Sequence, residues 1–523
     1  MIAYAWAPFD NVFFGCGILF GGIAVFLLLL TAWFNSILPS FPEPPSGLDV
    51  PTSFSPISRW VWGKKWLLQG RNLLIKAHAP RQSYMLPTPK NYCVFISNEQ
   101  NIKEFASNPD FSLNQAYDDL FSYKHNKLYH DQQESALINQ QYYFRVLREG
   151  LTTKLAGLYP YMYETLVKEM DGHISRKSEV NGWKSIHYYP FLEYVTVSMI
   201  GPIFWGQPLW DVPEFQDAAR RFPAQYFKFG EIVQHVPKIT IPLVKYAVTG
   251  GNKYRNVLIK HLLPIIRKQL SEEAKQEKTG DESPFCDIMQ DAIRMVRGKA
   301  YWTPERVILL LESLWRAGGH SVPMTIAHIV NSLCEHPEYF EPLREELQQH
   351  QDMDFKTLES LPLANSFMKE VIRTRPLDSA STRRKAMKTH TFQNGPHVPA
   401  GNIVCIPSLS IMNDASIYPN PQVFDGFRFV TANDAGMVNE SPDMKGMSKV
   451  TDVNLKFPFW GYGKEACPGR FFASIEMKIV MAILVSRYDF KLAKPETPTS
   501  WSWRTIAVPR RDSVLLIRER SGE

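Results

Sequence analysis

One cysteine in a glycine-rich loop constrains this 523-residue chain more than any other feature. Residues 457–475 read FPFWGYGKEACPGRFFASI, in which glycines surround Cys467 and an apolar stretch typical of a helix begins at Arg470. A cysteine at the amino terminus of a helix faces unpaired backbone N–H groups and the positive end of the helix dipole, which both favour the thiolate. A thiolate there suits a nucleophile, a redox cysteine or an axial ligand of haem iron. No recognisable motif supplies a base for a nucleophile, and no second cysteine lies close in sequence, which counts against the first two roles.

The amino-terminal part of the chain predicts a membrane anchor. Residues 12–34 contain no charged residue and include LFGGIAVFLLLLTAWF, and one crossing of a bilayer core needs about 20 apolar residues. The leader, residues 1–11, contains Asp10 but no Lys or Arg, unlike the basic leader of a cleaved signal peptide. Basic residues begin only at Arg59, so the positive-inside tendency places residues 1–11 in the lumen and the rest of the chain in the cytosol. The alternative is a buried core helix.

The remainder of the chain reads as one large domain. Residues 35–57 are rich in proline, which fixes φ and removes a backbone donor, and they predict a stiff hinge. No later segment resembles a second linker, and the polar stretches 275–284 and 433–452 read as surface loops. Helical patterns outnumber strand patterns. We therefore expect residues 58–523 to form a single cytosolic domain, mainly α with minor β.

Composition and charge narrow the function classes. Hydrophobic residues make up 45% of the chain and charged residues 21%, which is typical of a globular protein and excludes a disordered tail protein or a polytopic transporter. The six cysteines are too scattered for a disulfide scaffold or a zinc ribbon. The formal charge of +6 is mild and spread along the chain. It suits an anionic membrane surface or an acidic partner better than nucleic acid.

A second constraint is a long apolar run after Thr303. This threonine, followed by a proline and a glutamate, is typical of a helix start. The run predicts a central buried helix, yet its middle reads AGGHS at 317–321, followed by Pro323. Each glycine costs about 1 kcal/mol relative to alanine in a helix, and proline cannot donate a helical hydrogen bond. We expect a deformed turn there, which either accommodates close packing or lets a flat ligand lie against the helix.

Together these segments resemble the cytochrome P450 superfamily. WGYGKEACPG at 460–469 is similar to the haem-thiolate loop FxxGxxxCxG of that family, and EVIR at 370–373 is similar to its ExxR pair. FDGFRF at 424–429 resembles the later FDxxRF element, and AGGHS at 317–321 resembles the oxygen-activation motif of the central helix. The elements follow in the family's order, and with the anchor and hinge the likeness covers essentially the whole chain. It is closest to microsomal enzymes of filamentous fungi and implies one large helical domain behind a transmembrane helix.

The resemblance assigns roles to individual residues. It makes Cys467 the axial thiolate, and hence the metal ligand, of haem b. Trp460, Gly463 and Gly469 are the further residues of the haem loop. The ExxR pair and the later arginine imply structural support beneath that loop, and the residues concerned are Glu370, Arg373 and Arg428. Taken alone, an ExxR match carries little information, because it also describes an ordinary ion pair on a helix surface.

Several positions depart from the family pattern. Trp460 stands where the family usually has Phe, and Glu465 stands where it often has an Arg or His that meets a haem propionate. A carboxylate at 465 would repel a propionate, so we expect this anchor to be lost or turned to solvent. Arg148 resembles the arginine of the WxxxR element, and Arg384 resembles the propionate arginine after the ExxR helix. Arg383 could replace Arg384 in holding a haem carboxylate by charge-assisted bonds.

The acid–alcohol pair of the central helix also differs. The family usually has Asp or Glu and then Thr, where this chain has His320 and Ser321. The pair delivers protons as the O–O bond of dioxygen breaks, while the thiolate donates electron density. Serine keeps the hydroxyl and histidine titrates near neutral pH, so both residues are candidates for proton delivery. The alternative for His320 is a residue bonded to a backbone carbonyl.

The resemblance implies a monooxygenase in the endoplasmic reticulum membrane. Such an enzyme inserts one oxygen atom of O2 into a lipophilic small molecule, with electrons from NADPH through a diflavin reductase. Lys464 and Arg470, beside the haem loop, are either part of its docking face or solvated surface charges. The segments 114–133 and 222–233, and the residues after Arg375, are candidates for substrate contact. Their aromatic and apolar content suits a large, greasy molecule, and the resemblance implies a terpenoid, polyketide or alkaloid of secondary metabolism.

Two other functions stay open from the sequence. One is a haem-thiolate isomerase or dehydratase that needs neither O2 nor NADPH. Some enzymes of that class lack the acid–alcohol pair, so the hydroxyl of Ser321 argues against it. The other is a non-catalytic haem-binding membrane protein. Turnover that depends on NADPH and reductase separates the first two functions, and the third predicts haem binding without turnover.

Overall fold

The described part of the chain leaves the predicted membrane anchor outside it. The computed structural model describes residues 56–77, 82–88, 91–122, 125, 141–236, 238–271, 287–350, 353–430 and 449–520. The predicted lumenal segment 1–11, the anchor 12–34 and nearly all of the hinge 35–57 lie outside these residues. Within the described ranges, no helix combines the length and the apolar character needed to cross a bilayer.

Helices form most of the described chain. In chain order they are α2 (Pro56–Ala77), α3 (Glu99–Ser107), α4 (Leu113–Phe121), the π-helical turn η1 (Val146–Leu151), α7 (Leu155–Ser175), α8 (Tyr188–Trp205), α9 (Gln207–Trp210), α10 (Pro213–Ile232), α11 (Ile241–Thr249), α12 (Lys253–Leu270), α13 (Ile288–Val296), α14 (Pro304–Glu335), α15 (Phe340–Gln348), α16 (Phe355–Ser360), α17 (Pro362–Thr374), α18 (Ser408–Met412) and α19 (Arg470–Arg487). The larger hydrophobic core lies among α7, α8, α10, α14, α17 and α19.

The strands form small sheets. A five-stranded sheet has the order β1-β2-β9-β6-β3, with β1 (Tyr84–Pro87), β2 (Tyr92–Phe95), β9 (Ile403–Ile406), β6 (Ser381–Ala386) and β3 (Phe111–Ser112). A four-stranded sheet has the order β10-β13-β5-β4, with β10 (Tyr488–Leu492), β13 (Val514–Glu519), β5 (Trp183–His187) and β4 (Glu179–Val180). Two hairpins pair β11 (Ser500–Trp503) with β12 (Ile506–Pro509) and β7 (His390–Thr391) with β8 (His397–Val398).

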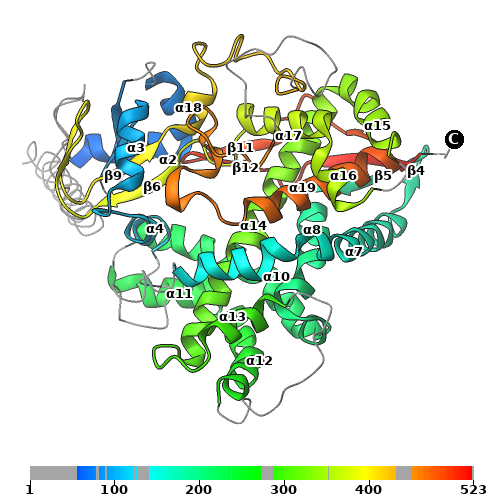
Figure 1. Ribbon diagram of the computed structural model, residues 1–523, viewed down its shortest axis with the longest axis horizontal. Coiled ribbons are helices and arrows are strands. Elements are labelled where there is room, and N and C mark those ends of the chain that lie inside the picture. The colour runs from blue at the N-terminus through cyan, green and yellow to red at the C-terminus, as the bar shows by residue number, and fades with distance from the viewer. Residues whose placement is uncertain are drawn as a thin grey trace, which may run out of the picture.

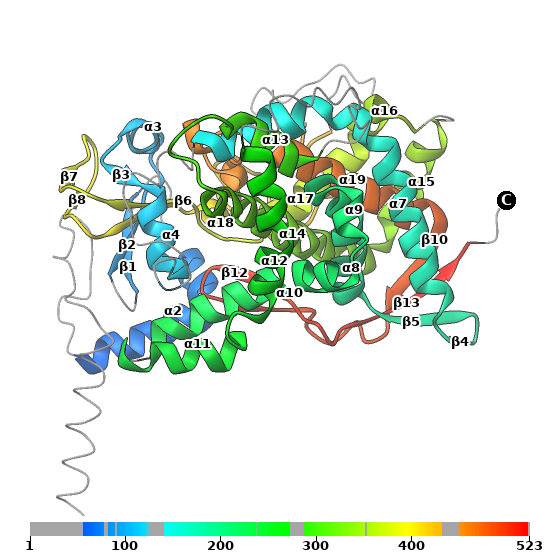
Figure 2. The same cartoon turned by 90° about the horizontal axis from the view of Figure 1, so that it is seen from below.

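The helical body and the five-stranded sheet occupy different sides of the molecule. Figures 1 and 2 show the sheet at one end, beside α2 and α3, and the long helices α7, α8, α10, α14 and α19 at the other. The strand β2 pairs with β9 in parallel, although the two are more than 300 residues apart in sequence (Cys93 opposite Ile403). The prediction of a mainly α fold with minor β is confirmed for the described residues.

The central helix α14 is the scaffold of the site. It begins at Pro304, and the side chain of Thr303 caps it by accepting a hydrogen bond from the Arg306 backbone, as the sequence predicts. It packs against α8, α10, α12 and α19. The expected deformed turn is wrong, because α14 stays helical through residues 317–321 and through Pro323.

The reason for one central glycine is close packing. A Cβ on Gly318 would lie 3.2 Å from the ring of Phe204 on α8, which is tighter than almost all real contacts. A Cβ on Gly319 would meet Trp315 only at an ordinary 3.6 Å. Between the two interpretations of this glycine pair, the packing one therefore fits Gly318.

Candidate active site

The cysteine loop is shaped by its glycines and by hydrogen bonds of its backbone. Gly461 and Gly463 have φ values of 81° and 76°, a region that favours glycine. A Cβ on Gly463 would also come within 3.0 Å of α3. The Cys467 N–H donates to the Trp460 carbonyl at 2.7 Å, and Arg470 Nη1 donates to the Cys467 carbonyl at 2.9 Å. The loop thus presents Cys467 directly before α19, as the sequence predicts.

The surroundings of Cys467 do not by themselves produce a thiolate. The backbone N–H groups of Gly469 and Arg470 and the Arg470 charge lower the pKa of the thiol, but burial raises it more, so the pKa is raised overall. The N–H groups at the start of α19 favour the thiolate, as the sequence predicts, but burial of the charged sulfur costs more than these groups return. A coordinated metal ion would supply the missing positive charge, since a thiol bound to a metal loses its proton outright.

The central helix brings the predicted proton-delivery pair onto a partly open face. Ala317 is exposed and both His320 and Ser321 are partly exposed, although α14 is otherwise largely buried. Ser321 Oγ donates to the Ala317 carbonyl at 2.8 Å. The His320 ring stacks on Phe227 of α10 with a centroid distance of 4.9 Å. Within the described residues this ring has no hydrogen bond to a backbone carbonyl, which was the alternative for it.

Burial lowers the pKa of His320, so the imidazole is neutral at neutral pH. The helix that carries it packs directly against α19, which follows the cysteine loop. Phe204 of α8 connects the two helices, because its ring lies against Gly318 and has a centroid 6.4 Å from that of Phe472. The cysteine loop and the central motif therefore belong to one packed unit.

The two neighbouring arginines of β6 have different partners. Arg383 pairs with Asp378 and donates to Thr505. Burial lowers the pKa of this guanidinium, but the charge and the hydrogen bonds of Asp378 raise it more, so the pKa is raised overall. Arg384 is 3% exposed, and its Nε lies 2.7 Å from Oε2 of Glu465 in the cysteine loop. Arg384, not Arg383, is the arginine that reaches the loop. The Glu465 carboxylate is therefore not turned to solvent but pairs with Arg384, and the loss of a propionate anchor at position 465 stays a prediction.

The donors at this site fit a haem. Cys467 offers a sulfur ligand, and Arg384 Nη1 is held by the carbonyls of Phe105 and Ala106 at 3.0 and 3.2 Å. Arg384 Nη2 is buried and has no hydrogen-bond partner in the described part of the chain. An orphaned guanidinium N–H suits a carboxylate such as a haem propionate.

Arg148 lies elsewhere than Arg384. It is exposed on η1 and lines a cavity of about 340 Å³ together with Phe144, Gly463, Lys464 and other residues of the cysteine loop. The structure therefore places Arg148 beside the loop but does not bring it together with Arg384. Gly469 has open space around it and an ordinary φ, so no steric reason requires glycine there.

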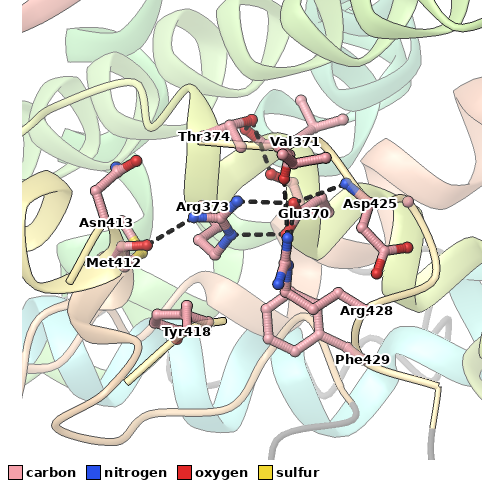
Figure 3. A network of polar contacts seen from close by, with 12 residues as sticks. Glu370, Val371, Arg373, Thr374, Met412, Asn413, Tyr418, Asp425, Arg428 and Phe429 are labelled. Carbon is pink, nitrogen blue, oxygen red and sulfur yellow. Dashed lines mark hydrogen bonds and ion pairs between the residues drawn. The ribbon is translucent and has the colours of Figure 1, made fainter. Parts of the chain in front are cut away.

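The ExxR residues form a buried ionic network (Figure 3). Arg373 donates from Nε and Nη2 to the Glu370 carboxylate at 2.7 and 2.8 Å, and both side chains are fully buried. Arg428 Nε lies 3.2 Å from the same carboxylate, and the Asp425 N–H donates to it at 3.0 Å. Arg373 also donates to the Met412 carbonyl at 2.8 Å. A surface ion pair, the trivial explanation of this motif, is thereby excluded.

The sequence reasoning missed a charged cluster on α14. Glu312 is 1% exposed and accepts two hydrogen bonds from Arg255 of α12, at 2.7 and 2.8 Å. Arg316 lies 4.0 Å from the same carboxylate and 4.0 Å from the ring centroid of Tyr226 on α10. The available signal was the presence of two charged residues inside the apolar run VILLLESLWRAGG.

Comparison with known proteins agrees with this geometry. A model of the cytochrome P450 family matches residues 77–516. Cytochrome P450 monooxygenase AN1598 of Emericella nidulans is 30% identical over 397 residues, covering 73% of this chain and 71% of that protein. Cytochrome P450 monooxygenase janQ of Penicillium janthinellum is 26% identical over 545 residues, covering 96% and 98%. The structure of retinoic acid bound cyanobacterial CYP120A1 is 18% identical, with a TM-score of 0.63 over 92% of this chain and 100% of that chain.

The chain belongs to the cytochrome P450 family. The prediction of that family, and of an enzyme of the P450 monooxygenase type, is confirmed. Members of the family are haem-thiolate iron enzymes, so haem is the cofactor. The likeness to the solved structure shows the fold alone.

Proposed function

We propose that this chain is a membrane-anchored monooxygenase that inserts one atom of O2 into a lipophilic molecule of fungal secondary metabolism. The observation that carries the proposal is the family match over residues 77–516, combined with Cys467 in its loop at the start of α19. Its curated relatives in Emericella nidulans and Penicillium janthinellum are named as monooxygenases. Haem bound through the Cys467 sulfur supplies the redox chemistry that activates O2.

Ser321 is the residue we assign to proton delivery. Its hydroxyl lies on the partly open face of α14 and donates to the Ala317 carbonyl at 2.8 Å. A hydroxyl accepts a proton from one side while it donates on the other, so rotation about Cβ–Oγ passes a proton from solvent to the reacting oxygen. His320, neutral and stacked on Phe227, borders the same face and limits the space through which water enters.

The electron donor is, in this proposal, an NADPH-dependent diflavin reductase on the same membrane. Arg148, Lys464 and Arg470 line the cavity of about 340 Å³ beside the cysteine loop, and the first two are exposed. A basic concave surface attracts an acidic partner and steers its approach. Electrons that enter there would reach the sulfur of Cys467 through the loop.

The membrane part of the proposal is supported by exposed apolar residues on two helices. Leu68 and Ile75 of α2 are 59% and 44% exposed, and Leu243 and Tyr246 of α11 are each 71% exposed. Figure 2 shows α2 and α11 along the same edge of the molecule. The apolar residues 12–34 precede α2 in sequence, so an endoplasmic reticulum membrane that held them would lie near this edge.

The coupling of NADPH use to product formation tests the proposal. Ser321→Ala, reconstituted with reductase in lipid vesicles, is expected to consume NADPH while product falls at least tenfold and peroxide rises. Ser332→Ala is the matched control, because it removes another hydroxyl from α14, about three helical turns beyond Ser321. Unchanged coupling in Ser321→Ala removes the proton-delivery assignment. Turnover without NADPH and reductase would instead indicate an isomerase or dehydratase.

A further inference from the structure

A buried lysine lies directly before the ExxR pair. Lys369 of α17 is 0% exposed, and its Nζ donates to the Lys449 carbonyl at 2.9 Å and to the Asp452 carboxylate at 3.1 Å. The same ammonium lies 4.7 Å from the ring centroid of Phe457, which precedes the cysteine loop. A buried charge is costly unless it is paired and hydrogen-bonded. Both of these polar contacts are made to one short segment, residues 449–452.

Residues 449–452 form a turn that is closed by its own hydrogen bonds. The Asp452 N–H donates to the Lys449 carbonyl at 3.2 Å, and the Lys449 N–H donates to the Asp452 carboxylate at 2.8 Å. Between them, Val450 is 0% exposed, and its carbonyl accepts a hydrogen bond from Trp460 Nε1 at 2.7 Å. Lys369 therefore holds both ends of the turn that presents this carbonyl to Trp460.

Trp460 connects the turn to the cysteine. Its backbone carbonyl accepts the Cys467 N–H at 2.7 Å, while its indole N–H donates to Val450. A phenylalanine at this position would have no side-chain donor and could not make the second bond. The hydrogen bonds thus continue from Lys369 through the turn and the indole to the backbone of Cys467.

We propose that Lys369 is a positioning residue for the haem thiolate, which acts by fixing the turn 449–452 and, through that turn, the indole of Trp460 and the cysteine loop. The contacts behind a metal ligand hold it in the orientation that the metal requires. When the turn is released, the loop moves more freely and the sulfur leaves the iron more often. This inference rests on Cys467 as the haem ligand of the proposed function and adds the residues that hold this ligand in place.

A double-mutant cycle tests whether Lys369 acts through Trp460. The full-length haem-loaded protein is reduced under carbon monoxide in detergent, at a urea concentration below its unfolding transition, and the conversion of the thiolate-type Soret band to an unshifted band is timed. We expect Lys369→Met and Trp460→Phe each to convert about fivefold faster than wild type, the factor that corresponds to one net hydrogen bond. Because the two residues act in series, the double variant should convert no faster than either single variant.

Lys478→Met is the matched control, because Lys478 is also a buried lysine, 2% exposed, whose Nζ pairs with Glu359 of α16 at 2.6 Å. It is expected to lower the urea midpoint of unfolding without changing the conversion rate. If Lys369→Met does not fold, Asp452→Asn takes its place in the cycle and is judged by the same criteria.

Two results overturn the role of Lys369. One is an unchanged conversion rate in Lys369→Met, and the other is a double variant whose effect is the product of the two single effects, as independent losses of stability would give. Either result, obtained while wild type shows the thiolate-type band, leaves the proposed function standing. Absence of that band from wild type instead refutes Cys467 as the haem ligand and with it the proposed function.

Discussion

The buried carboxyl group of Glu476 leads to a sharp prediction about stability. Glu476 lies on α19, is 0% exposed, and neither of its oxygens has a hydrogen-bond partner within the described residues. Burial raises the pKa of this carboxyl group well above its ordinary value of 4.5. The folded protein therefore keeps the proton on Glu476 to a higher pH than the unfolded chain does.

The sign and size of the effect follow from proton linkage. Because the pKa is raised in the folded state, the contribution of Glu476 to stability is fully present below the unfolded pKa and declines as the pH rises above it. The free energy of unfolding falls by about 1.4 kcal/mol for each pH unit until the folded pKa is reached. Glu476→Gln has nearly the same shape and cannot ionise, so this decline is absent in the variant.

We expect Glu476→Gln and wild type to have similar stability near the ordinary pKa of a glutamate, with the variant increasingly more stable toward neutral pH. Urea unfolding followed by circular dichroism at a series of pH values measures the difference. Glu345→Gln, which changes an exposed glutamate of α15, is the control and should show no pH-dependent difference. A difference between Glu476→Gln and wild type that does not change with pH would refute the reasoning, since it would mean that the buried carboxyl titrates as it does in the unfolded chain.

Two further predictions concern the supports of the haem loop. Glu370→Gln removes the negative charge that pairs with Arg373, and both of these side chains are 0% exposed. Breaking such a buried pair is expected to lower the free energy of unfolding by about 3–5 kcal/mol. An unchanged urea midpoint would contradict the structural role of Glu370. Glu465 lies two residues before Cys467, the expected iron ligand, and pairs with Arg384. Its negative charge favours ferric iron, so Glu465→Gln should move the ferric–ferrous midpoint potential to more positive values. Redox titration measures that shift, the exposed Glu496→Gln should show none, and a negative shift would count against the pair's proximity to the haem.

Local sequence signals predicted the elements that carry the site. Thr303 and the proline after it marked the start of α14, and the glycines around Cys467 marked a loop that the structure places directly before α19. Such signals act within a few residues, where the cap and the glycine φ values are decided by neighbouring atoms. The family pattern also named Glu370 and Arg428, which the fold brings to within 3.2 Å of each other.

What the sequence could not supply depends on burial and on distant partners. Arg383 and Arg384 are neighbours in the chain, and only the position of Asp378 and Glu465 in the fold distinguishes them. The raised pKa of Cys467 comes from desolvation, which no local motif reports. For the same reason the sequence missed the buried charges of α14, since the main partner of Glu312 is Arg255 on α12.

The central claim is that Cys467 is the thiolate ligand of a haem. The most direct measurement is the carbon-monoxide difference spectrum of the reduced, detergent-purified protein, recorded beside Cys467→Ser. The account predicts a far red-shifted Soret band for wild type and its loss in the variant. An unshifted, imidazole-type band in both proteins, or the absence of haem from wild type, would contradict it.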